Sequence, residues 1–150
     1  MSLVSLLVIP KLQGFLGPDL SGTARHLIAT IRHLRDQAEI TKQIYRLNYD
    51  LDAGEYWAGA VRETEASEET SPAIKRIALP GRIRFQDVVT LHQGKVTGGK
   101  AFTQFYPVGR VEKTLIHLTL DRDQVLTLVI NPLTGSVKVY DHYVEEREKG

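Results

Sequence analysis

The sequence has no cysteine among its 150 residues. Disulfide scaffolds, thiolate zinc sites and cysteine nucleophiles are therefore excluded. An excess of charge of one sign is lacking as well, because 19 Lys and Arg stand against 18 Asp and Glu, a formal net charge of +1. Such a balance supplies no overall field that would recruit nucleic acid or an anionic membrane, although a local basic patch stays open.

Long hydrophobic runs are also lacking. The apolar stretch at residues 3–9 is far shorter than the roughly 20 residues that a bilayer-spanning helix needs. It has neither the basic n-region nor the small-residue cleavage site of a secretory signal. Three interpretations remain: a core segment of the domain, an interfacial anchor, or the end of a longer hydrophobic helix that was cut away.

What the sequence does have is the composition of an ordinary globular domain, with 42% hydrophobic and 25% charged residues. Its length fits one domain with a substantial core. From Ser21 onward, apolar residues recur at steps of three and four, which predicts an amphipathic helix with its N-cap at Ser21 or Thr23. The stripe consists of Ala24, Leu27, Ile28, Ile31, Leu34 and Ala38.

The rest of the chain is predicted to form strands, against which the helix packs. Residues 44–49 and 55–61 flank an Asp- and Gly-rich turn, which predicts a hairpin. The acidic segment 62–71 is expected to be a solvated, mobile loop. Further strands are expected at 83–88, 100–106, 114–120, 125–130 and 137–140, the last two joined by a turn that Pro132 and Gly135 close.

No residue pattern in the sequence supports catalysis, a cofactor or a metal. His26 and His33 share a helix face without a zinc motif, and are expected to be solvated. The other three histidines, at positions 92, 117 and 142, have no serine or carboxylate motif around them. The glycines at 94, 98 and 99 lie between strands with no helix after them, so they do not form a phosphate loop. These absences leave no residue on which to place catalysis, and a soluble enzyme on a small β scaffold is the alternative class that no site supports.

An aromatic cluster on the predicted hairpin has two interpretations. Its members are Tyr45, Tyr49, Tyr56 and Trp57. They could stack nucleic-acid bases, but Arg46 is the one basic residue among them, and base-stacking surfaces need interleaved Lys and Arg. The core of the domain is the simpler interpretation.

Taken in order, these features resemble the GspH/FimT family of minor pseudopilins and minor pilins. The resemblance runs from about residue 3 to residue 143. It rests on TKQIYRL at 41–47 leading into DLDAGEYW at 50–57, on FYPVG at 105–109, and on LTLVINPLTGSV at 126–137. Each motif is weak alone, and their order and spacing carry the resemblance.

The resemblance implies an α+β, pilin-like fold in which a long N-terminal helix packs on an antiparallel β-sheet or β-sandwich head. Residues 1–20 would be the remnant of the hydrophobic helix, left by an engineered truncation, and residues 21–150 the helix and the head, soluble in this form. Gly14 and Phe15 match the dipeptide of a prepilin signal, but neither the Glu nor the long apolar run follows, so no processing site is assigned. The implied helix-packing residues are Leu27, Ile28, Ile31 and Leu34, and the implied structural motif residues are Phe105, Pro107, Gly109, Asn131, Pro132 and Gly135.

The implied function is that of a minor pseudopilin of a type II secretion system. Such a protein is a structural subunit near the tip of a periplasmic pseudopilus, where it helps to initiate assembly and drive export. A single helix anchors it in the bacterial inner membrane, with its head in the periplasm. Its partners would be the other minor pseudopilins, the major pseudopilin and, for the precursor, the prepilin peptidase, with no cofactor and no small-molecule substrate.

The alternative is a type IV minor pilin of the FimU or FimT kind, in the latter case a DNA-binding module for uptake. DNA binding requires a basic element to meet phosphates. Arg110, Lys113 and Lys138 could form a small patch, whereas the segment 62–71 and the tail 145–149 are acidic. The acidic segments argue against nucleic acid as a partner.

Overall fold

The computed structural model describes residues 18–61, 70–121 and 123–145. Its one described helix, α2, spans Pro18–Thr41. Ser21 and Thr23 therefore lie inside the helix, where both are buried, and the N-cap prediction is wrong. The helix begins upstream of Ser21, at Pro18, and proline is well tolerated in the first turn of a helix. The Oγ of Ser21 has no hydrogen-bond partner among the described residues.

The described strands form two antiparallel sheets. The first sheet has the order β3-β2-β1-β6 and the second the order β5-β4-β7-β8-β9. The first consists of β1 (Tyr45–Asp50), β2 (Glu55–Val61), β3 (Thr70–Ala78) and β6 (Lys100–Phe105). The second consists of β4 (Ile83–Thr90), β5 (Gly94–Val96), β7 (Thr114–Leu120), β8 (Gln124–Ile130) and β9 (Val137–Tyr140).

The predicted hairpin is confirmed as β1 and β2, which pair from Tyr45 opposite Ala60 to Asp50 opposite Glu55. The side chain of Asp50 accepts a hydrogen bond from the backbone N–H of Ala53 at 3.0 Å, an Asx-type contact that fixes the turn. The turn at residues 131–135 is also confirmed, with Gly135 at φ 77°. Local turn chemistry thus sets both connections.

Two strands were not predicted. Thr70 and Ser71, expected in the acidic loop, belong to β3, and residues 62–69 of that loop lie outside the described residues. β3 forms because the outer side of β2 offers it a pairing partner, and Pro72 is tolerated because β3 is an edge strand. β5 is a short edge strand that pairs with β4 where the glycines suggested only turns.

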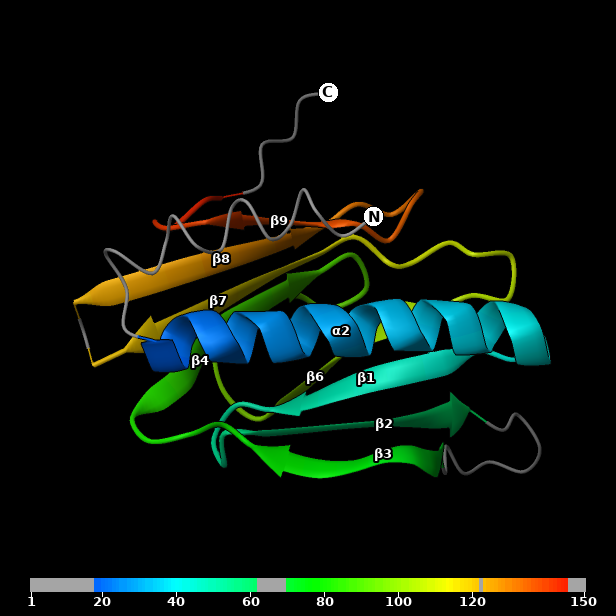
Figure 1. Cartoon of the computed structure of the whole chain (residues 1–150), viewed down its shortest axis with the longest axis horizontal. Helices are drawn as coiled ribbons and strands as arrows, with labels where there is room; N and C mark the ends of the chain where they lie inside the picture. Colours follow the sequence, from blue (N-terminus) through cyan, green and yellow to red (C-terminus); the bar gives the residue numbers. More distant parts are fainter. Residues whose placement is uncertain (1–17, 62–69, 122, 146–150) are drawn as a thin grey trace.

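The helix α2 packs over the junction between the two sheets, against β1 and β6 of the first and β7 of the second. Figure 1 shows the helix in front of both sheets, nearly parallel to the long axis of the molecule. This arrangement confirms the α+β fold with a long helix on an antiparallel head. No helix among the described residues combines the length and the apolar character needed to cross a bilayer.

A buried chain of hydroxyl groups joins the two sheets beneath the helix. Tyr49 Oη lies 2.8 Å from Thr103 Oγ1, which lies 3.0 Å from Thr114 Oγ1. Thr114 Oγ1 donates to the carbonyl oxygen of Glu112 at 3.0 Å. Because that carbonyl can only accept, Thr103 donates to Thr114 and Tyr49 donates to Thr103. Burial raises the pKa of Tyr49 well above its usual value, so the phenol stays protonated and can donate.

Candidate interaction surfaces

The apolar stripe of α2 faces the sheets. Leu27, Ile28, Ile31 and Leu34 are all buried, three of them completely. Leu27, Ile31 and Leu34 recur at steps of three and four, so they follow one another along one side of the helix, and Ile28 lies beside Leu27. His26 and His33 project from the exposed side, as expected for solvated histidines.

Two of the family-motif segments meet at the C-terminal end of α2. Arg35 Nε donates to the carbonyl oxygen of Gly109 at 3.2 Å, and Gly135 lies against the same side chain. A Cβ added to Gly135 would lie 2.4 Å from Arg35 Cδ, so the arginine side chain would have to shift to admit it. The backbone N–H of Val111 donates to the carbonyl oxygen of Pro132 at 3.0 Å. Segments 105–109 and 131–135 are therefore neighbours in space, which their separation in the sequence did not reveal.

The motif residues differ in burial, backbone conformation and hydrogen bonding. Phe105 is completely buried, and Pro107 is half-buried. Gly109 adopts a φ of 90°, which favours glycine. Asn131 is exposed, and its Oδ1 accepts from the backbone N–H groups of Leu133 at 2.9 Å and Thr134 at 3.2 Å.

Several exposed apolar side chains lie on segments that end on this side of the molecule. Among the described residues, the large hydrophobic side chains that are exposed are Ile40, Leu91, Val108 and Leu133. They lie at or just beyond the ends of α2, β4, β6 and β8. The strand registers bring these ends together, because Thr90 pairs with Thr114, Thr114 with Ile130, and Tyr45 with Phe105.

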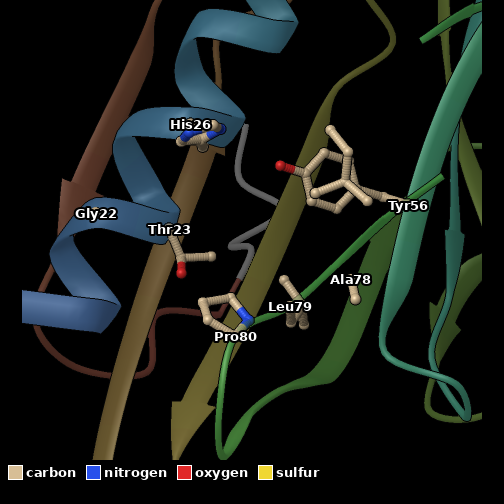
Figure 2. A pocket seen from close by; sticks show the side chains of 8 residues that line it. Gly22, Thr23, His26, Tyr56, Ala78, Leu79 and Pro80 are labelled. Atoms are coloured by element: carbon tan, nitrogen blue, oxygen red, sulfur yellow. The ribbon is translucent and has the colours of Figure 1, made fainter. Parts of the chain in front are cut away.

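A groove lies toward the other end of the helix (Figure 2). It has a volume of about 310 Å³ and opens between α2 and the β3 edge of the first sheet. Figure 2 shows Thr23 and His26 of α2 facing Tyr56, Leu79 and Pro80. Burial raises the pKa of Tyr56 above its usual value, and a hydrogen bond with Thr30 partly offsets the shift. The groove is lined mainly by apolar groups, so an aliphatic side chain of a partner would fit its chemistry.

Two histidines acquire carboxylate partners that the sequence did not suggest. His117 is completely buried, with Nδ1 2.6 Å from Asp87 Oδ1 and Nε2 2.8 Å from the carbonyl oxygen of Val144. The ring of Tyr143 stacks on that of His117 at 3.8 Å, and its hydroxyl donates to Asp87 Oδ2 at 2.9 Å. These contacts attach segment 143–144, beyond β9, to the second sheet.

The second pair is His92 and Glu112. His92 Nδ1 lies 2.6 Å from Glu112 Oε2, and the other carboxylate oxygen accepts from the backbone N–H of Gln104 at 3.1 Å. Among the described residues, no serine or threonine hydroxyl is hydrogen-bonded to the side chains of either pair. The described residues contain no group of three His, Cys, Asp or Glu side chains placed to hold a metal ion.

The aromatic cluster of the hairpin is mostly core. Tyr45, Tyr49 and Tyr56 are buried, so they cannot stack on bases. Trp57 is half-buried, and the guanidinium of Arg76 lies over its ring at 3.8 Å. Of the basic residues considered for DNA, Arg110 and Lys138 are exposed, and Lys113 is half-buried.

Comparison with known proteins identifies the fold. Neither the models of protein families nor the curated proteins contain a match to this sequence. Two structures of the minor pseudopilin EpsH from the type 2 secretion system of Vibrio cholerae do match. One aligns with a TM-score of 0.65 and 9% identity over 85% of this chain and 99% of the other. The second aligns with a TM-score of 0.58 and 10% identity over 79% and 93%. The chain thus has the pilin-like fold of these minor pseudopilins.

Proposed function

We propose that this chain is a minor pseudopilin, a structural subunit of the pseudopilus of a type II secretion system, and not an enzyme. The observation that carries the proposal is the fold match, which extends over nearly the whole length of EpsH. Because identity is only 9%, the proposal rests on the arrangement of helix and sheets and not on individual residues.

In a pseudopilus subunit of this kind, the N-terminal helix would join the β-sheet head to the rest of the filament. Residues 1–20 would be the remaining part of a membrane anchor, and residues 21–150 the helix and the periplasmic head. The buried side chains Leu27, Ile31 and Leu34 support the part of this proposal that joins the helix to the head, since they pack α2 against the sheets. A force on the helix would then move the head as one body. We place the subunit near the filament tip, where it would help to initiate assembly, with other minor pseudopilins and the major pseudopilin as its partners.

The alternative is a minor pilin of a type IV system, including a DNA-binding form. The exposure of Arg110 and Lys138 favours it, because exposed basic residues can meet phosphates. The buried tyrosines of the hairpin and the covered ring of Trp57 weigh against base stacking. We therefore keep the secretion system as the proposed function.

The test is mass spectrometry of the native protein captured from the membranes of its own cells. The expected result is a methylated N-terminal residue on an apolar helix, together with co-captured pseudopilins. The prepilin peptidase is expected to act on the precursor, so its loss should abolish the methylated form. Co-captured type IV pilus subunits would instead favour the alternative. Capture with neither set of proteins would overturn both assignments.

A further inference from the structure

The second sheet carries a row of polar side chains on the face that α2 does not cover. Asp87, His117 and Thr127 lie side by side on β4, β7 and β8, because Asp87 pairs with His117 and His117 with Thr127. We call these three residues the polar row. Ile116 and Leu118 belong to the core beneath the helix, so His117 between them points to the opposite face. The polar row is nonetheless buried, with at most 3% of each residue exposed. A part of the chain other than the helix therefore covers it.

The cover is the segment 141–145, which follows β9 and which we call the strap. It lies outside the strands of the sheet. Thr127 Oγ1 donates to the carbonyl oxygen of His142 at 2.7 Å and accepts from the backbone N–H of Val144 at 3.1 Å. The carbonyl oxygen of Val144 lies 2.8 Å from Nε2 of His117. Two buried side chains of the sheet therefore contact the main chain of the strap at three points.

One side chain of the strap is also held specifically. The ring of Tyr143 stacks on that of His117, with the ring planes 9° from parallel. Its hydroxyl donates to Asp87 Oδ2 at 2.9 Å, and Lys95 Nζ lies 5.6 Å from the centre of its ring. A stacking platform, a carboxylate acceptor and a cation together favour an aromatic ring that carries a hydroxyl group. The polar row thus binds both a main chain and a tyrosine, which is how proteins recognise peptides.

The strap leaves space beside it on the same face. A cavity of about 600 Å³ opens next to Tyr143 and is lined by Gln86, Lys95, Thr97 and Val125. The ammonium of Lys95 favours an acidic side chain there. The strap lies outside the hydrophobic core, so it can detach while the core stays intact. A segment that supplied the same tyrosine and also filled the cavity would make more contacts with the sheet than the strap does.

We propose that the polar row is a docking site for a tyrosine-bearing segment of a partner protein. The strap occupies this site in the free chain, and the partner segment displaces it. The tyrosine of the partner takes the place of Tyr143, and an acidic side chain next to it enters the cavity near Lys95. This inference does not depend on the proposed secretion function, because the site is built from the second sheet and the strap alone.

The test uses the 150-residue chain with its strap weakened by Tyr143→Ala and Val144→Pro. These changes remove the stacked ring, its hydroxyl and the N–H that donates to Thr127, and they leave the polar row unchanged. The ligand is a capped peptide with the sequence of residues 141–145, titrated by calorimetry. We expect the weakened-strap chain to bind it about tenfold more tightly than the parent, because the site of the parent is free only while its strap is open. Adding Thr127→Val should remove this gain, since that hydroxyl bonds the main chain of the strap twice.

Two controls separate recognition from charge and from folding. A peptide of the same composition in scrambled order should bind the weakened-strap chain no more tightly than it binds the parent, and circular dichroism melts should show that each variant is folded. A measurement on the parent needs no variant: the ordered peptide should accelerate hydrogen exchange at the amide of Val144, and the scrambled peptide should not. Equal affinity of the parent and the weakened-strap chain for the ordered peptide, equal affinity of the two peptides, or unchanged exchange at Val144 would overturn the inference.

Discussion

The buried imidazole of His117 lies between the carboxylate of Asp87 and the backbone of Val144. Nδ1 faces a carboxylate oxygen at 2.6 Å and Nε2 faces the carbonyl oxygen of Val144 at 2.8 Å. Each ring nitrogen therefore lies within hydrogen-bond distance of an oxygen. The buried pair is surrounded by polar partners, because Tyr143 donates to the second oxygen of Asp87 and Val144 contributes its backbone.

Acid should weaken the fold through Asp87. Burial alone would raise the pKa of this carboxyl, but hydrogen bonds from His117 and Tyr143, with the nearby positive charges, hold it below its usual value of 3.8. The unfolded chain therefore binds the proton more readily than the folded one. The stabilisation is fully present above about pH 4 and is lost as the pH falls through the depressed folded pKa.

Asp87→Asn is the variant that checks this pH dependence. We expect it to cost about 2 kcal/mol at pH 7, because the buried side chains of His117 and Tyr143 lose the carboxylate that they contact. The free energy of unfolding of Asp87→Asn should also fall less steeply than that of the parent between pH 4 and pH 2. Urea titrations across this range, with the exposed Asp123→Asn as the control, make the measurement. Parallel pH profiles for the parent and Asp87→Asn would contradict the assignment.

The hydroxyl chain between the sheets predicts an asymmetry between two substitutions. Tyr49→Phe removes the terminal donor and leaves the bond from Thr103 to Thr114 intact, so it should cost only about 1 kcal/mol. Thr103→Val should cost about 1 kcal/mol more, since it leaves the buried phenol of Tyr49 without an acceptor. Chemical denaturation of both variants and of the double variant measures the difference. Equal costs, or a larger cost for Tyr49→Phe, would refute the proposed order of donors and acceptors in the hydroxyl chain.

The contact between Gly135 and Arg35 predicts the effect of a single methyl group. Gly135→Ala faces both a positive φ of 77° and a clash with Arg35, whereas Gly94→Ala faces a φ of 70° in open space. We expect Gly94→Ala to cost about 1–2 kcal/mol and Gly135→Ala to cost about 1–3 kcal/mol more. Removing the side chain with Arg35→Ala should reduce the excess. Thermal melts of the parent, Gly94→Ala, Gly135→Ala and Gly135→Ala combined with Arg35→Ala measure these costs. Equal costs for the two glycine substitutions would show that the loop or the Arg35 side chain moves aside without a free-energy cost.

The helix stripe predicts that Ile31→Asp unfolds the head. Ile31 is completely buried against the sheets, so an aspartate there would place an unpaired charge in apolar surroundings, at a cost on the order of 4 kcal/mol. The adjacent Arg32→Asp is the control, because Arg32 is exposed and its replacement should cost only about 0.5 kcal/mol. Circular dichroism melts measure both. A parent-like melt for Ile31→Asp would show that the helix does not dock as described.

DNA binding distinguishes the two candidate functions. We expect the chain to bind duplex DNA no more tightly than a neutral control protein at physiological salt, because its formal net charge is only +1 and its hairpin tyrosines are buried. Fluorescence anisotropy with a labelled duplex makes the measurement. Submicromolar binding that is lost in Arg110→Ala with Lys138→Ala would favour the uptake function.

The sequence alone was informative wherever structure depends on near neighbours. The stripe through Leu27 and Ile31 predicted the helix and its buried side, the turn at Asp50 predicted the first hairpin, and Gly135 predicted the turn before β9. Periodicity and turn chemistry act over a few residues, so they can be read directly from the chain. The start of the helix was missed because Ser21 has the side chain of a cap but lies within the helical segment.

Tertiary structure decided what depends on distant partners. β3 exists because β2 offers it an edge, and the division of the strands into two sheets follows from pairings such as β1 with β6. His117 looked isolated in the sequence, and only the pairing of β4 with β7 and the return of the chain beyond β9 bring it to Asp87 and Val144. The exposed residues Ile40, Leu91, Val108 and Leu133 likewise belong to separate segments, whose ends the strand pairing brings to one side of the molecule. Sequence determined the local elements through short-range sterics and periodicity, whereas long-range packing decided which surfaces those elements share.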